Sequence, residues 1–145
     1  MRAGATFDTA DQHPPLLQYS EDSLLRFDEG LIGFSNCKSF VLLESEGIAP
    51  FRRLQSTERH EVGFLVLDTA YVTKEFPSLV PERDWESIGL TDPNARLAVV
   101  ICIIGPTPAE STGNFQAPLI INCANMTGRQ VIIGDTEFSS RHPLV

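Results

Sequence analysis

The stretch from residue 95 to residue 104 constrains the fold of this chain more than any other part of it. All of its residues except Arg96 are apolar, and because successive strand residues point to opposite sides, both of its faces are apolar. Such a strand needs cover on both sides, so we predict a central strand or a barrel stave that is buried throughout. The stretch is longer than most buried strands, which predicts that it bends or changes sheets.

Short apolar runs separated by turn-forming residues fill most of the remaining chain, a pattern typical of all-β domains. One short helix is predicted over residues 81–88, because Pro81 suits a first turn, Trp85 and Ile88 share a face, and Gly89 ends it. The chain has no alternation of strands and helices, and closing a sheet removes its exposed edges. We therefore predict a mostly β fold, a small closed or near-closed antiparallel β-barrel with one short helix. The predicted strands span residues 24–27, 39–44, 51–56, 62–68, 95–104, 114–123 and 129–135.

The length of 145 residues fits one domain with a core of its own. Residues 1–18 lack apolar periodicity and contain the helix-breaking sequence His13-Pro14-Pro15, so they are predicted to form a flexible N-terminal tail. Residues 19–145 are predicted to form the barrel domain.

The chain is acidic, with 11 basic and 19 acidic side chains and a net charge of −8. A protein of this sign repels phosphate backbones, which argues against direct nucleic-acid binding. The charge serves solubility in one interpretation, and in another it suits a basic protein partner.

The three cysteines predict neither a disulfide framework nor a zinc site, because Cys37, Cys102 and Cys123 are irregularly spaced and form no Cys-x-x-Cys pair. Cys102 is interpreted as a small buried hydrophobe. No cofactor motif occurs, no apolar run is long enough to span a membrane, and the first residues are polar. The sequence thus predicts a cytoplasmic protein without a cofactor and without a membrane partner.

Catalysis is not expected, since the sequence contains no nucleophile elbow, phosphate-binding loop or zinc-protease signature. The alternative is a small hydrolase-like enzyme, which would have to combine Asp68 or Asp135 with His60 or His142. The hydroxyls of residues 139 and 140 lie beside His142 in sequence, but sequence adjacency does not make a triad. We interpret these side chains as exposed turn and terminal residues.

Uncharged polar residues inside otherwise apolar runs are the remaining candidates for function: Gln55, Ser56, Asn114, Gln116, Asn122 and Gln130. A buried amide must find hydrogen-bonding partners or it costs stability. In one interpretation these residues anchor turns and bulges; in the other, some of them present amides to a partner chain.

Several short motifs follow one another in a consistent order and spacing from about Leu24 to the C-terminus. They are Gly30-Leu31-Ile32-Gly33-Phe34, Phe40, Pro50-Phe51, Leu54-Gln55-Ser56, residues 64–68, residues 114–122 and Gly128-Arg129-Gln130-Val131. Together they resemble the FliW family of flagellar assembly factors, and the resemblance leaves only the N-terminal tail uncovered. One departure lies between Phe51 and Leu54, where the family often has apolar or aromatic residues and this chain has Arg52-Arg53.

The resemblance implies a β-barrel-like fold and a switch between two partners. FliW proteins bind newly made flagellin and, in many bacteria, the RNA-binding translational regulator CsrA. When flagellin is exported, the released FliW antagonises CsrA and relieves repression of flagellin synthesis. An acidic protein docked beside the basic RNA-binding surface of CsrA is expected to weaken RNA binding, as a coupling between two sites.

The implied contact with flagellin is a terminal helical segment lying in an apolar groove whose rim carries a few amides. Phe115 is interpreted as a core residue because it lies within an apolar strand. The candidate partner-binding residues are the apolar anchors Phe34 and Phe51 and the rim residues Gln55, Ser56, Asn114 and Gln116.

Overall fold

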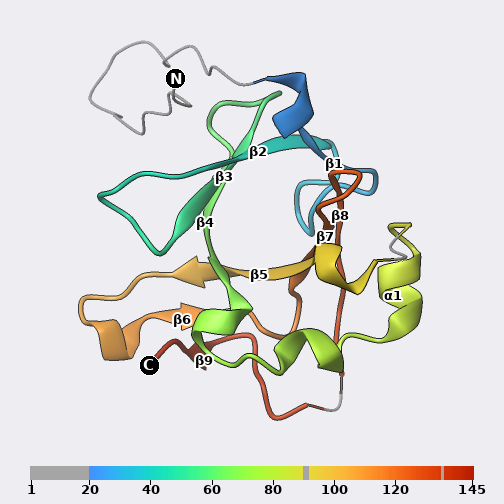
Figure 1. The fold of residues 1–145 in the computed structure, drawn as a ribbon. Helices are drawn as coiled ribbons and strands as arrows, with labels where there is room; N and C mark the ends of the chain where they lie inside the picture. Colours follow the sequence, from blue (N-terminus) through green and yellow to red (C-terminus); the bar gives the residue numbers. More distant parts are fainter. Residues whose placement is uncertain (1–19, 90–91, 135) are drawn as a thin grey trace.

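The computed structural model describes residues 20–89, 92–134 and 136–145 (Figure 1). The predicted tail over residues 1–18 therefore lies outside the described residues, as does Asp135.

Among the described residues, seven strands close into a barrel in the order β4-β3-β2-β1-β8-β7-β5, and pairing of β4 with β5 completes the ring. Neighbouring strands run antiparallel except β1 and β8, which pair in parallel through Arg26 and Thr127. The predicted closed, mostly β barrel is confirmed, with this one parallel pairing added. The strands are β1 (Leu25–Phe27), β2 (Ser39–Leu43), β3 (Arg52–Ser56), β4 (Gly63–Asp68), β5 (Arg96–Ile103), β7 (Leu119–Asn122) and β8 (Thr127–Gln130).

The long apolar strand β5 changes its partner along its length, as its length predicted. Its first half pairs with β7, from Arg96 to Val99, and its end pairs with β6 (Thr112–Gly113). The short strand β9 (His142–Pro143) pairs with β6 in turn, which brings the C-terminus alongside the end of β5 (Figure 1).

Two apolar cores lie on the two faces of β5. Val99 packs into the cluster inside the barrel, together with Phe27, Phe40, Leu54 and Leu119 from facing strands. The neighbouring residues of β5 point outward into a second cluster; they are Ala98, Val100 and Cys102. Burial on both faces is therefore confirmed for the middle of the strand, Ala98 to Val100, and the predicted buried position of Cys102 is confirmed as well.

The prediction of burial throughout is wrong at the end of the stretch. Ile103 is 66% exposed and Ile104 is 48% exposed, and Ile101 is half-buried. Beyond Ile101 the strand no longer pairs with β4 or β7, and Cys102 and Ile103 pair with the two-residue strand β6, which leaves Ile103 uncovered.

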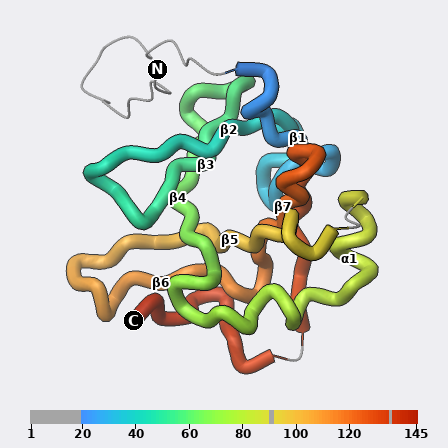
Figure 2. The backbone as a smooth tube through the Cα atoms, in the orientation of Figure 1, coloured from blue at the N-terminus to red at the C-terminus, as the bar shows by residue number. Residues whose placement is uncertain are grey.

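The outer core is covered by the chain between β4 and β5, which runs along one side of the barrel (Figure 2). Trp85 and Ile88 share the buried face of this segment, as predicted, although the helix is shorter than residues 81–88. The helical elements here are η2 (Thr69–Tyr71), η3 (Phe76–Leu79), α1 (Glu82–Glu86) and η4 (Pro93–Ala95), and two further turns are η1 (Glu21–Ser23) and η5 (Pro108–Glu110).

Two predicted strands are shorter than expected. Residues 114–117 form a turn ahead of β7, where the Oδ1 atom of Asn114 accepts the backbone N–H groups of Gln116 and Ala117. The strand β8 ends at Gln130 and not at residue 135 as predicted, although Val131 N–H still donates to the carbonyl of Pro118. Pro118, which lacks an N–H, stands just outside β7 and accepts this bond.

Candidate functional site

Two adjoining pockets of about 470 and 440 Å³ share Pro50, Phe51 and Tyr71 as a common wall. We call the combined depression the Pro50 groove. It lies between the turn that precedes β3 and the loop that follows β5, which project on the same side of the molecule (left in Figure 1).

Local hydrogen bonds hold the common wall in place. The turn before β3 closes through Phe51 N–H donating to the carbonyl of Ile48, and the Ala49–Pro50 peptide within it is cis. On the facing element, the carboxylate of Asp68 caps η2 by accepting the N–H of Ala70 at 2.9 Å. This cap fixes the start of η2, at whose end the ring of Tyr71 stands 64% exposed.

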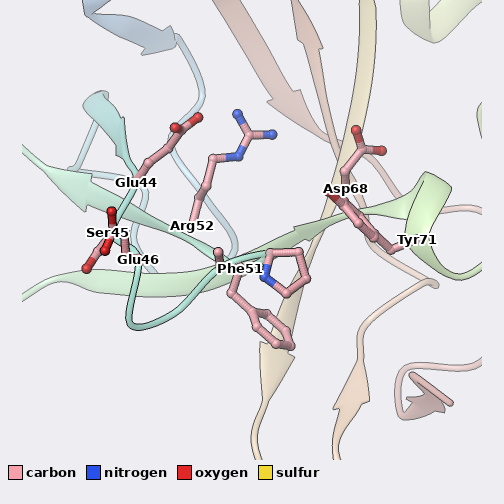
Figure 3. A pocket seen from close by; sticks show the side chains of 9 residues that line it. Glu44, Ser45, Glu46, Phe51, Arg52, Asp68 and Tyr71 are labelled. Atoms are coloured by element: carbon pink, nitrogen blue, oxygen red, sulfur yellow. The ribbon is translucent and has the colours of Figure 1, made fainter.

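One end of the groove is acidic. Figure 3 shows the side chains of Glu44, Arg52 and Asp68 extending to one side of the strands, whereas the ring of Phe51 points the other way. Glu46 lines the same pocket, so the lining of this end holds three carboxylates and one guanidinium. Among the described residues, no side-chain hydrogen bond or ion pair engages Arg52, so this end carries a net negative charge and groups able to bind a partner.

The other end of the groove is apolar. Its polar groups are satisfied within the loop, because Ser111 is buried and its hydroxyl accepts Gly105 N–H at 3.0 Å. Leu144 N–H donates to the carbonyl of Ser111, which fastens the C-terminal residues to the same wall. The apolar lining residues are Leu67, Ile104, Pro106, Pro108, Leu144 and Val145.

Of the six residues predicted to bind a partner, Phe51 alone lines the Pro50 groove. Phe51 is half-buried against the outer core. Phe34 packs instead at the inner core, with its ring 5.3 Å from that of Phe64. Phe115 is fully buried between Phe76 and Phe138, so its interpretation as a core residue is confirmed.

Gln55 and Ser56 lie buried at the end of β3, where they organise the turn into β4. The amide nitrogen of Gln55 lies 3.0 to 3.1 Å from the carbonyls of Ser56, His60 and Val62, and its oxygen accepts Arg53 Nε at 2.9 Å. The hydroxyl of Ser56 accepts two backbone N–H groups of the same turn. These contacts favour the turn-anchoring interpretation of both residues.

Asn114 and Gln116 lie in the turn before β7. Asn114 is half-buried and caps that turn, whereas the side chain of Gln116 is exposed. The structure thus separates the predicted rim into two turns that hold themselves together, and the role of these residues in partner binding stays a prediction.

The two consecutive arginines point to opposite faces of β3, as strand geometry requires. Arg52 enters the groove, and Arg53 lies against Gln55 on the other face. Burial lowers the pKa of Arg53 below its ordinary value. Gly63 makes room for it, since a Cβ there would lie 2.6 Å from the Arg53 guanidinium.

The alternative enzyme would combine Asp68 or Asp135 with His60 or His142, and of these four residues Asp135 lies outside the described residues. Asp68 and His60 lie at opposite ends of β4, a separation on the order of 20 Å for a strand of this length. His142 packs against Phe138 in a tilted arrangement, with ring centres 4.7 Å apart. Within residues 20–89, 92–134 and 136–145, no group of three potential metal ligands forms, and no helix has the length and apolarity needed to cross a membrane.

Cys37 and Cys102 are buried, and Cys102 is not poised for nucleophilic chemistry. Burial raises the pKa of the Cys102 thiol to about 12, so the thiolate that nucleophilic chemistry requires is absent near neutrality. Cys123 is exposed, and partial burial of its thiol raises its pKa as well.

Sequence reasoning missed Tyr71, Ile104 and the acidic end of the groove. Tyr71 lies in a connection that carries no strand pattern, and Ile104 was assigned to a buried strand. One local signal was present in Asp68-Thr69-Ala70. An aspartate side chain often accepts the backbone N–H two residues further on, which predicts a capped turn at the end of the strand.

The fold and the groove define a small closed β-barrel with an amphipathic surface depression, a class suited to holding a segment of another chain. A sequence model of the family described as FliW protein matches residues 10–144. The chain belongs to the FliW family. Among its relatives, the flagellar assembly factor FliW of Leptospira interrogans (serovar Lai) is 35% identical over 130 residues, covering 89% of this chain and 87% of the relative.

Two further comparisons agree. The flagellar assembly factor FliW of Clostridioides difficile (strain 630) is 34% identical over 117 residues, which cover 81% of this chain and 90% of the relative. A crystal structure of the flagellar assembly factor FliW superimposes with a TM-score of 0.79 at 29% identity, covering 88% of this chain and 89% of the other. These relatives are named as assembly factors.

Proposed function

We propose that this protein binds flagellin in the cytoplasm and, when flagellin is exported, binds and antagonises the translational regulator CsrA, which relieves repression of flagellin synthesis. The observation that carries the proposal is family membership over nearly the whole chain, residues 10–144. Its relatives act in flagellar assembly by name, and an assembly factor without a catalytic centre acts by binding.

The physical chemistry of the surface supports a protein partner. A free flagellin subunit has an apolar helical face that is buried only in the filament, and such a face needs cover before export. The Pro50 groove offers apolar walls that are open to solvent, and exposed apolar patches with polar borders mark interaction sites. A complex of this kind buries on the order of 1,200–2,000 Å².

The net charge of −8 supports the second partner. CsrA binds RNA through a basic surface, and complementary charge accelerates association with such a surface. The same charge disfavours a direct contact between this protein and RNA. We further propose that the protein has no catalytic activity, because Asp68 and His60 lie at opposite ends of β4 and His142 packs against Phe138.

Titration calorimetry tests the proposal. The folded protein is titrated with full-length flagellin and with a flagellin that lacks its terminal helical segment. We expect binding to the full-length subunit only, and displacement of one partner when CsrA is added to the preformed complex. Equal affinity for both flagellins would contradict the helix-in-groove contact, and no binding to either would contradict the proposed function.

A further inference from the structure

We infer that the flagellin segment lies in the Pro50 groove, with its apolar face against Phe51, Tyr71 and Ile104 and a basic side chain at one end against the carboxylates of Glu44, Glu46 and Asp68. This inference rests on the proposed function and assigns it a place on the molecule. It also specifies the partner chemistry: an apolar face that ends in a lysine or arginine.

The apolar half of the argument rests on exposure. Tyr71 is 64% exposed, Ile104 is 48% exposed and Val145 is 82% exposed, and all three line one pocket. Single exposed apolar residues need no explanation, but three around one depression form a patch of the kind that partners cover. Tyr71 also has the features of an interface anchor, since its ring adds contact area with little loss of side-chain entropy.

The electrostatic half rests on the carboxylates. Glu44 and Glu46 are exposed and make no ion pair with any residue that the structure describes, so a cation of a partner finds them available. One arginine against three carboxylates leaves a net attraction for positive charge. A pair between a partner ammonium group and these carboxylates is stronger beside the apolar wall than in open water, because the wall lowers the local dielectric constant.

Charge also decides between flagellin and a second copy of this chain. In a symmetric dimer through this groove, both copies would bring the same acidic surface to the interface, with Arg52 as the one cation that each contributes from the acidic end. Each copy carries a net charge of −8 as well. The groove therefore favours a partner segment with positive charge over self-association.

The apolar contact is tested with a double variant and a matched control. Tyr71→Ser combined with Ile104→Ser removes two apolar groups from the groove. Ile32→Ser combined with Ile132→Ser removes two residues that are 60% and 74% exposed and line neither pocket. The four side chains are between 48% and 74% exposed, so both variants are expected to keep the melting temperature of the parent protein.

By calorimetry, the groove variant should bind flagellin at least tenfold more weakly, whereas the control variant should keep the parent affinity. Equal affinity of parent and groove variant would overturn the inference while leaving the proposed function intact. A parent protein that does not bind flagellin would instead remove the proposed function itself. Loss of self-association in the groove variant, seen by sedimentation without loss of flagellin binding, would assign the groove to a second copy and overturn the inference.

The charge contact has its own test. Glu44→Gln with Glu46→Gln should weaken binding several-fold at low salt and reduce the dependence of affinity on salt, since screening acts on the pairs that are removed. Glu21→Gln with Asp22→Asn, on η1, removes the same charge away from the groove and should leave both unchanged. The inference fails if the two variants weaken binding equally, because net charge alone would then account for the loss.

Photo-crosslinking locates the contact without weakening it. A benzophenone amino acid in place of Tyr71 should form a covalent product with the terminal segment of flagellin, and the same group in place of Ile132 should not. Crosslinking from position 132 and none from position 71 would overturn the inference, even if a groove variant failed to fold.

Discussion

Both ends of strand β3 have polar residues beside an apolar one, but the polar residues are buried at one end and line an open groove at the other. At its end, Gln55 and Ser56 are polar, buried and fully engaged with the turn into β4. At its start, Arg52 follows Phe51 into an open groove, and among the described residues its guanidinium makes no side-chain hydrogen bond or ion pair. The comparison teaches that residue type alone does not identify a binding site. A site is where polar and apolar groups are left without a partner in the folded chain.

The largest expected difference in stability between a buried residue and a groove residue is the one between Phe115 and Phe51. Phe115 is fully buried and contacts two other phenylalanines, so Phe115→Ala should lower the free energy of unfolding by about 3–5 kcal/mol. Phe51 is half-buried, so Phe51→Ala should cost clearly less than Phe115→Ala. Urea denaturation of both variants measures the difference.

The affinity for flagellin should be affected in the opposite order, more by Phe51→Ala than by Phe115→Ala. Phe51→Ala removes a wall of the groove and should weaken binding, whereas folded Phe115→Ala should bind like the parent below its melting temperature. A similar stability loss in both variants would show that Phe51 belongs to the core and would break the comparison.

Gln55 and Gln116 test the same comparison among amides. Gln55→Ala removes the donor to the carbonyls of His60 and Val62 and the acceptor of one Arg53 hydrogen bond, and should cost about 1–3 kcal/mol of stability. Gln116→Ala removes an exposed side chain and should change stability by less than about 0.5 kcal/mol. Thermal melts measure both, and calorimetry with flagellin measures binding.

The binding result separates the two interpretations of these amides. If they anchor turns, neither variant loses affinity for flagellin once it is folded. A loss of affinity in Gln55→Ala at unchanged stability would restore it as a rim residue and argue against the Pro50 groove as the whole contact.

The barrel was predictable from the sequence because its signal is local. Both faces of β5 are apolar up to Cys102, and two cores require two apolar faces. The parallel pairing of β1 with β8 was not predictable, because it joins residues about a hundred positions apart through backbone groups that carry no sequence signal.

The predicted binding residues do not gather in one place: Phe51 lines the Pro50 groove, whereas Gln55 is buried in the turn after β3. The sequence could not show this, because a polar residue in an apolar run has the same pattern whether it binds a turn or a partner. Only the position of the backbone carbonyls around Gln55 decides between them. The groove joins three separate segments, around residues 50, 71 and 104, which no local pattern connects.

The smallest expected effect concerns two arginines: Arg96 forms an ion pair, and Arg52 forms none with the described residues. Arg96 donates to the carboxylate of Glu82 at 2.7 Å and lies over the ring of Trp85. This hydrogen bond lowers the pKa of Glu82 below its ordinary value of 4.5. A carboxyl with a lowered pKa in the folded state adds stability above its ordinary pKa, and that contribution is lost as the pH falls through the lower folded pKa.

Melting temperatures of the parent and of Glu82→Gln should therefore differ slightly at pH 7, and the difference should shrink as the pH falls below 4.5. Arg52→Gln is the matched variant, and it should leave the melting temperature unchanged over the same pH range because no carboxylate of the described residues pairs with it. Arg52→Gln should instead raise the affinity for a basic segment at low salt, because it removes the one cation beside three carboxylates. A stability loss in Arg52→Gln as large as that in Glu82→Gln would show that Arg52 is engaged within the fold, and the two ends of β3 would then no longer differ in the way the groove requires.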